Sequence, residues 1–276
     1  MDLSKLSYSK GEPGLTQRDP VHVPSKEAVR NHTVLELPKA SPTYSKKEGV
    51  LSTNLVFVLS GGEKREKDFL LELIKQRTIR SLRVVFMSEQ RQGLQPFQMH
   101  ERWKEIQTKG VFKIDSQEFH LDAMDKVFLL SDVDEFYNQL VKILSTDAEK
   151  EQGQWIISNP CFEIWLYYCY LNNPERDLAR LKTEPIRTRS KLLKTLCSEL
   201  RSGGFNSCLA FEHLKTGIEN SLAHFNVDEN GVPKLYATNM YEMATFLVDT
   251  MNQYNDEYEI FLKRKAEWRN KMKANK

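Results

Sequence analysis

Four short apolar runs, each followed by a segment with helical spacing, constrain the fold of this chain more than any other feature. The runs cover residues 54–60, 82–87, 126–131 and 154–158. The first reads Asn-Leu-Val-Phe-Val-Leu-Ser, without alternation, which is typical of a strand buried on both faces of a parallel sheet. Strands that alternate with helices predict an α/β domain with a mostly parallel sheet flanked by helices.

Only helical patterns follow residue 159. We expect helices over 160–172, 189–201, 207–224, 238–251 and 254–273, in addition to those over 63–76, 96–109 and 135–144. The C-terminal half is therefore predicted to be largely helical. The last helix mixes acidic and basic residues heavily, which is typical of a helix that faces solvent or a partner.

The first part of the chain has a different composition. Residues 1–52 are poor in large apolar side chains and rich in Ser, Pro, Lys and Gly, which predicts a flexible N-terminal arm. We therefore divide the chain into this arm, a folded domain over 53–252 and a charged C-terminal helix or tail over 253–276.

Charge and cysteine content narrow the class of protein. The 276 residues carry 40 Lys and Arg against 38 Asp and Glu, a formal net charge of +2. This balance argues against a protein that coats nucleic acid, but it leaves a local basic groove open. The four cysteines lack C-x-x-C spacing and are interpreted as reduced thiols, which favours a cytoplasmic location.

No apolar stretch reaches ~20 residues, so we expect no membrane-spanning helix. The chain has no G-x-x-x-x-G-K-[ST] loop, so any energy from ATP must come from a partner.

Two aspartates follow the third apolar run. Asp132 and Asp134 stand at the carboxyl end of a predicted parallel strand, where ligands bind in open α/β sheets. Carboxylate oxygens at such a position suit Mg²⁺ or Mn²⁺. The alternative is structural: Asp132 caps the next helix, and Glu135 completes a capping box.

Charged residues also follow the first run. Glu63, Lys64 and Glu66 come directly after Gly61-Gly62, and so are expected at the same edge of the sheet. The alternative is a solvated first turn of a helix, where acidic residues interact favourably with the helix dipole.

The fourth run leads into Ser-Asn-Pro-Cys-Phe-Glu-Ile-Trp at residues 158–165. Asn159 is a natural N-cap, and Pro160 fits the first helical turn. Glu163 is not explained by a helix start, because it falls one place past the capping-box position. It also lies among large apolar residues, where a carboxylate needs a partner or a metal. Carboxylates after three strands thus predict a site for one or two Mg²⁺ ions, an arrangement used for phosphodiester hydrolysis.

These segments resemble the pattern of the RloB-like family. In that pattern one strand ends in Glu-Gly, followed by Glu-Lys-Thr-Glu and an aromatic residue. A second strand ends in Asp-x-Asp, and a third runs into Ser-Asn-Pro-x-Phe-Glu-x-Trp. The corresponding residues here are 62–66 with Phe69, 132–136 and 158–165. Weaker similarities lie at 217–221 and 237–241, so the resemblance covers about residues 54–250.

The resemblance implies a Toprim-type nuclease domain that acts in bacterial defence against phage, in the manner of abortive infection, gated by an ATPase partner. It implies that Asp132, Asp134 and Glu163 hold Mg²⁺ or Mn²⁺ and that Lys64 stabilises charge on the phosphate. The substrate is left open between DNA and RNA, and so is the existence of a homo-oligomer.

One position departs from the family pattern. Gly61 stands where the family carries its first catalytic Glu. Two interpretations follow: Glu63 or Glu66 takes over this role, or the domain is catalytically degenerate and binds nucleic acid or regulates a partner without cutting.

Several basic residues follow the segment 158–165. Arg187, Arg189 and Lys191, with Lys194 and Arg201 further on, predict a track for a nucleic-acid backbone. The alternative is a solvated helix face.

Overall fold

The computed structural model describes residues 43–44, 53–75, 78–89, 94–114, 117–123, 125–146, 153–253 and 256–274. Apart from strand β1 (Thr43–Tyr44), the predicted arm over 1–52 lies outside the described residues. The centre of the fold is a four-stranded sheet in which every strand pair is parallel. Its strands, in spatial order, are β3 (Leu82–Met87), β2 (Asn54–Ser60), β6 (Lys126–Asp132) and β7 (Gly153–Ser158). The predicted α/β class is confirmed.

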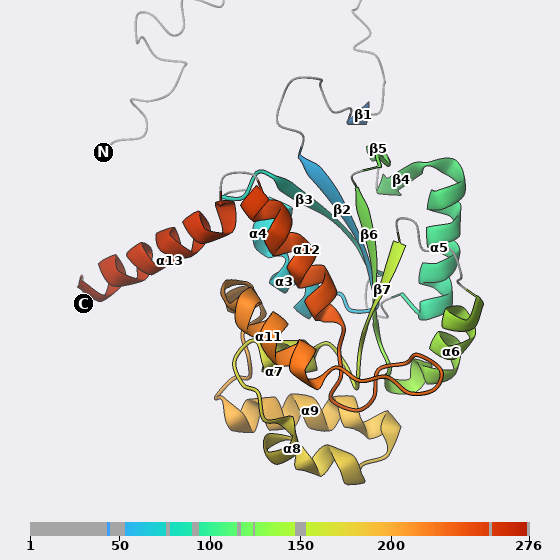
Figure 1. The fold of residues 1–276 in the computed structure, drawn as a ribbon, viewed down its shortest axis with the longest axis vertical. Coiled ribbons are helices and arrows are strands. Elements are labelled where there is room, and N and C mark those ends of the chain that lie inside the picture. Colours follow the sequence, from blue (N-terminus) through green and yellow to red (C-terminus); the bar gives the residue numbers. More distant parts are fainter. Residues whose placement is uncertain are drawn as a thin grey trace, which may run out of the picture.

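Helices cover both faces of this sheet (Figure 1). Helices α5 (Pro96–Lys109) and α6 (Tyr137–Thr146) pack on one face, against alternate residues of β2 such as Leu55 and Phe57. Helices α3 (Arg65–Phe69), α4 (Leu71–Lys75) and α12 (Met240–Gln253) pack on the other, against Val56 and Val58. Because β2 is buried on both sides, its sequence is a continuous apolar run rather than an alternating one.

The C-terminal part is helical, as predicted. Its elements are α7 (Glu163–Tyr168), α8 (Pro174–Asp177), α9 (Ile186–Leu200), α10 (Ser207–Ala210), α11 (Leu214–His224), α12 and α13 (Glu257–Ala274). Short 3-10 turns lie at Asp134–Phe136, Ala179–Thr183 and Phe211–His213. Within the described ranges, none of these helices combines the length and apolar composition needed to cross a membrane.

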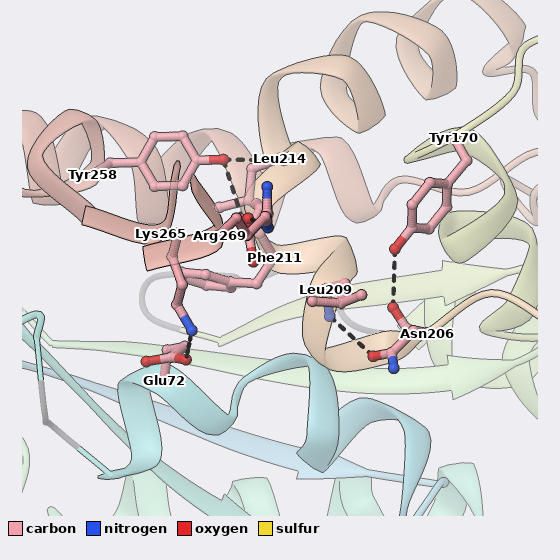
Figure 2. Close-up of polar contacts among 10 residues, drawn as sticks. Glu72, Tyr170, Asn206, Leu209, Phe211, Leu214, Tyr258, Lys265 and Arg269 are labelled. Carbon is pink, nitrogen blue, oxygen red and sulfur yellow. Dashed lines mark hydrogen bonds and ion pairs between the residues drawn. The ribbon is translucent and has the colours of Figure 1, made fainter. Parts of the chain in front are cut away.

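Helix α13 contacts the rest of the fold as far as Arg269, which pairs with Glu212, and its C-terminal end extends away (Figure 1). The Tyr258 hydroxyl accepts a hydrogen bond from the Leu214 backbone N–H and donates one to the Phe211 carbonyl, both at 3.1 Å. Lys265 forms an ion pair with Glu72 of α4 at 2.7 Å, and Figure 2 shows these contacts together.

A second, small sheet was not predicted. It contains β1, β5 (Gln117–His120) and β4 (Val111–Ile114), with β4 and β5 antiparallel. Each of the two longer strands has only four residues, too few to show a periodic pattern. Phe112 and Phe119 pack against Phe57, with ring centroids 4.7 and 6.0 Å away, so the small sheet extends the core.

The expected N-cap at Asn159 is wrong. Helix α7 begins at Glu163 with Phe162 in the N-cap position, and the Asn159–Pro160 peptide is cis. The Asn159 side chain instead donates a hydrogen bond to the Pro233 carbonyl at 2.7 Å. The segment after β7 is thus a turn tied to a distant loop, a partner that local sequence cannot reveal.

The weaker family-like segment at 237–241 covers the edge of β7. The Asn239 side chain accepts a hydrogen bond from the Ile157 N–H and donates one to the Trp155 carbonyl, at 2.6 and 2.8 Å. The hydroxyls of Thr238 and Ser158 are 2.8 Å apart. These bonds occupy backbone groups that an edge strand would otherwise expose.

Candidate functional site

Three carboxyl side chains gather at the carboxyl edge of the parallel sheet. Glu66 comes from α3 after β2, Asp132 ends β6, and Glu163 begins α7 after β7. Glu66 and Glu163 are each only 6% exposed. Their charges act on one another, since burial and then Glu66 and Glu163 raise the pKa of Asp132. We call Glu66, Asp132 and Glu163 the carboxylate cluster.

Gly62 provides the space for Glu66. A Cβ atom at Gly62 would overlap the Glu66 carboxyl group, so this group lies directly against the glycine. The Gly62 N–H donates to the Ser60 hydroxyl at 3.1 Å, which holds the turn at the end of β2. The absence of a side chain at Gly62 therefore lets Glu66 reach back from α3 to the edge of the sheet.

Asp132 is held by the turn after β7. Its Oδ1 accepts a hydrogen bond from the Phe162 backbone N–H at 2.9 Å. The 3-10 turn that follows β6 has Val133 in its N-cap position and no side-chain cap. The interpretation of Asp132 as a helix cap is therefore wrong, and its side chain points instead toward the segment that carries Glu163.

Glu163 contacts two groups that the sequence did not place in the site. The Cys161 thiol donates to its Oε2 at 3.0 Å, and the Lys194 ammonium lies 3.7 Å from its Oε1. Lys194 comes from α9, and its side chain is 57% exposed. Burial lowers the pKa of Lys194, but Glu163, Cys161, Asp132 and Glu66 outweigh this effect, and the pKa is raised. Helical phase could have indicated Lys194, because it lies between the buried Ser190 and Cys197 on one side of α9.

The cluster resists full ionisation. Burial, and then the charge of Glu163, raise the pKa of Glu66 to about 7 from its ordinary 4.5. Asp132 shifts in the same direction, because burial and the two neighbouring carboxylates disfavour its charged form. A cation at this place would relieve the repulsion.

The donor set fits a hard divalent cation in kind, because all three cluster residues offer carboxylate oxygens. In the part of the chain that the structure describes, no three Asp, Glu, His or Cys side chains are already arranged around one point as a metal site requires. The carboxylates would therefore have to turn toward one another to close around an ion.

Asp134 lies apart from the cluster. It occupies the turn after β6 with φ +21°, beside Ser190 of α9. Burial raises its pKa, and the charges that act on it come from Glu135 and Lys194 rather than from Glu66 or Glu163. The structure thus brings Asp132 and Glu163 together but leaves Asp134 to one side.

The other predicted residues are exposed, except for the half-buried Arg189. Glu63 and Lys64 precede α3, and neither is buried as Glu66 is. Arg187 and Lys191 lie on the exposed side of α9, while Arg189 donates from Nε to the Glu184 carbonyl at 3.0 Å. At helical spacing Arg187 and Lys191 lie on the same side of α9 as Lys194, whereas Arg189 lies on another side.

Replacing Gly62 with Ala is expected to expel the Glu66 carboxyl group from its place. Only the end of a flexible side chain must move, so stability should change little, while the pKa of Glu66 should fall from about 7 toward 4.5. Carboxyl NMR titration of ¹³C-labelled glutamate measures this directly. Gly61→Ala is the control, because a Cβ there meets the Leu94 carbonyl at 3.3 Å and not Glu66. An unchanged Glu66 titration in Gly62→Ala would contradict the geometry.

Comparison with known protein families found a match over most of the chain. The model of the family described as RloB-like protein matches residues 56–247, a range that contains the whole carboxylate cluster. Comparison with curated proteins found no match, and comparison with solved structures found none either. The family match spans well over half of the chain, and the chain therefore belongs to the RloB-like protein family.

Proposed function

We propose that this protein is a divalent-metal-dependent nuclease of Toprim type, which hydrolyses phosphodiester bonds in DNA or RNA. Its role is defence against phage, and an ATPase partner gates it. One observation carries the proposal: turns that follow three neighbouring parallel strands bring three carboxyl groups together, two of them with raised pKa values. Perturbed carboxyl groups that converge at this edge of a sheet are typical of an active site.

Metal binding and stabilisation of the phosphate charge are assigned to different residues. Asp132 and Glu163 hold Mg²⁺ or Mn²⁺, and Asp134 is a further candidate ligand if its carboxyl group turns away from Ser190. When bound, the ion supplies Lewis-acid activation of the phosphate and of water. Lys194, which already lies beside Glu163, stabilises negative charge on the phosphate.

Glu66 takes the role that the family assigns to the position of Gly61. Its carboxyl group is buried beside the two proposed metal ligands, a position that suits a general base. Glu63, the other candidate, is exposed and precedes the helix. The geometry therefore favours Glu66 over Glu63.

Metal binding tests the proposal without any partner. Calorimetric titration of Mn²⁺ and Mg²⁺ into the wild type is expected to show saturable binding, and Asp132→Asn is expected to lose it, because a ligand charge at the centre of the cluster is removed. Glu135→Gln is the matched control, since Glu135 is an exposed carboxylate in the same turn. Wild-type protein that binds neither ion would overturn the metal-dependent mechanism.

A degenerate domain is the second candidate. It is favoured by Gly61 in the position of the family's Glu, and by Lys194, which already balances part of the charge of the cluster. Such a protein would bind nucleic acid or regulate a partner. Equal binding of nucleic acid in EDTA and in Mg²⁺, with no cleavage under either condition, supports this candidate instead.

A further inference from the structure

An open pocket of about 530 Å³ lies between the beginning of α3 and the segment that joins α9 to α10. Residues 64, 65 and 68 form one side, and residues 201–209 form the other. None of the three residues of the carboxylate cluster lines it. The pocket is therefore a separate feature of the surface, formed by elements that pack on each other.

Positive charges outnumber negative ones in this pocket. Lys64, Arg65 and Arg201 line it together with one carboxylate, that of Asp68. Within the described residues, none of the three cations forms an ion pair. A guanidinium group offers parallel N–H donors that match the oxygens of a phosphate group, and the pocket holds two such groups.

Both arginines are held in position by uncharged groups. Arg65 donates from Nη1 to the Phe205 carbonyl at 3.0 Å, and the Arg201 guanidinium lies 4.8 Å from the ring centroid of Tyr170. Tyr170 in turn donates its hydroxyl to the Asn206 carbonyl at 3.1 Å (Figure 2). These contacts leave the remaining N–H groups of the arginines for a ligand, so less ordering is required when one binds.

Bare backbone forms part of the wall. Gly203 and Gly204 have φ values of +80° and +75°, which only glycine adopts readily. A Cβ atom at Gly203 would meet nothing within 4 Å, so open space lies beside the chain there. A ligand can approach this backbone closely.

The pocket adjoins the carboxylate cluster through α3. Arg65 directly precedes Glu66, and its charge acts on Glu66, opposing the rise in pKa that burial causes. The pocket and the cluster therefore receive side chains from neighbouring positions at the beginning of α3.

We propose that this pocket binds a phosphate group of a nucleic-acid strand, next to the phosphodiester that is hydrolysed at the carboxylate cluster. The inference rests on the proposed nuclease function and adds the place where the strand is held. The positive surplus, the positioned guanidinium groups and the open glycine backbone together define the ligand as a phosphate.

Binding without cleavage tests the assignment. Anisotropy of fluorescein-labelled single-stranded DNA and RNA oligonucleotides is measured in EDTA with the full chain. Arg65→Gln/Arg201→Gln is expected to weaken binding by about tenfold or more and to lower the slope of log affinity against log salt by about 1 to 2. The control is Lys271→Gln/Lys273→Gln, which removes the same charge from exposed positions in the last turn of α13 and is expected to weaken binding by less than about threefold. Equal losses in the two double variants would mean that binding follows net charge, and would overturn the assignment.

Lys64→Gln separates charge from structure, because it leaves the contacts of both arginines intact. It too is expected to weaken oligonucleotide binding; an unchanged affinity would count against the pocket. Calorimetry with inorganic phosphate and with AMP identifies the source of the phosphate. If AMP binds the wild type as tightly as the oligonucleotide does and loses affinity in Arg65→Gln/Arg201→Gln, the pocket holds a free nucleotide and the strand assignment is wrong.

The oligonucleotide assay is independent of the metal. Wild-type protein that binds oligonucleotides through the pocket but takes up no Mn²⁺ would overturn the nuclease and leave the phosphate pocket standing. Wild-type protein that binds Mn²⁺ but no oligonucleotide would overturn the phosphate pocket and leave the metal-dependent nuclease standing.

Discussion

Glu66→Gln is expected to stabilise the metal-free protein at pH 7.5 and, at the same time, to lower the proposed nuclease activity by about 10²–10⁴-fold. The loss of activity is the usual cost of removing a general base. The gain in stability follows because the variant no longer has to bury a charge beside two other carboxylates. Opposite changes in stability and activity are characteristic of a strained active-site group.

The raised pKa of Glu66 determines whether the free energy of unfolding rises or falls with pH. The pKa of Glu66 is raised in the folded state, from 4.5 to about 7, so the folded protein binds more protons than the unfolded chain between these values. The free energy of unfolding must therefore fall as the pH rises from about 4.5 through 7. At about 1.4 kcal/mol for each unit of pKa, the loss reaches up to roughly 3 kcal/mol above pH 7. In Glu66→Gln this part of the pH dependence is absent.

Urea denaturation in EDTA at pH 4.5 and 7.5 measures the effect. The difference between wild type and Glu66→Gln should be small at the lower pH and largest at the higher. Glu63→Gln is the matched control, because it removes an exposed carboxylate three residues away and should change stability by less than about 0.5 kcal/mol at either pH. Mn²⁺ binding should survive in Glu66→Gln, which separates it from Asp132→Asn. A variant less stable than wild type at pH 7.5 would refute the buried-charge account.

Trp165→Ala is expected to cost about 3–5 kcal/mol, the range typical of a fully buried Trp replaced by Ala. Trp165 is completely buried in α7, and its ring lies edge-on to Phe69 at 5.9 Å. Helix α11 approaches so closely that a Cβ atom at Gly217 would be 2.7 Å from the ring. The residues around Trp165 belong to helices on several sides, so they cannot collapse into the space without moving one of these helices.

Urea denaturation followed by circular dichroism checks this loss. Trp268→Ala is the matched control, because Trp268 of α13 is 60% exposed and its removal should change stability by less than about 0.5 kcal/mol. Trp165→Phe should lose less than Trp165→Ala, since the indole N–H has no hydrogen-bond partner among the described residues. Equal effects of Trp165→Ala and Trp268→Ala would mean that the α7–α11 packing contributes little.

The main sheet could be predicted because a strand buried on both faces has a sequence of its own kind. Strand β2 is apolar at nearly every position. Helices cover both of its faces, so side chains that point to either face are buried and are apolar. Strands β4 and β5 could not be predicted, because a four-residue strand packed by Phe112 or Phe119 alone shows no period.

The site was predictable in part for a similar reason. Asp132 and Glu163 follow strand ends, and parallel strands bring their carboxyl ends to one edge. Glu66 was one of two alternatives, and only burial and its contact with Gly62 distinguish it from Glu63. The helical phase of α9 places Lys194 beside the buried residues of that helix, but no local pattern encodes the packing of α9 on α7 that brings Lys194 to Glu163. Asn159 failed as an N-cap for the same reason, because its partner Pro233 is remote in sequence.

The order of these residues along the chain has a consequence for synthesis of the protein in the cell. Glu66, Asp132 and Glu163 come from separate segments, and Asp132 is fixed only when the Phe162 N–H is in place. A growing polypeptide that ends before Phe162 lacks both the Phe162 N–H and Glu163, and one that ends before α9 lacks Lys194. Ribosome-bound fragments and chains released too early therefore cannot assemble the carboxylate cluster with Lys194, which is complete only when translation has passed residue 194.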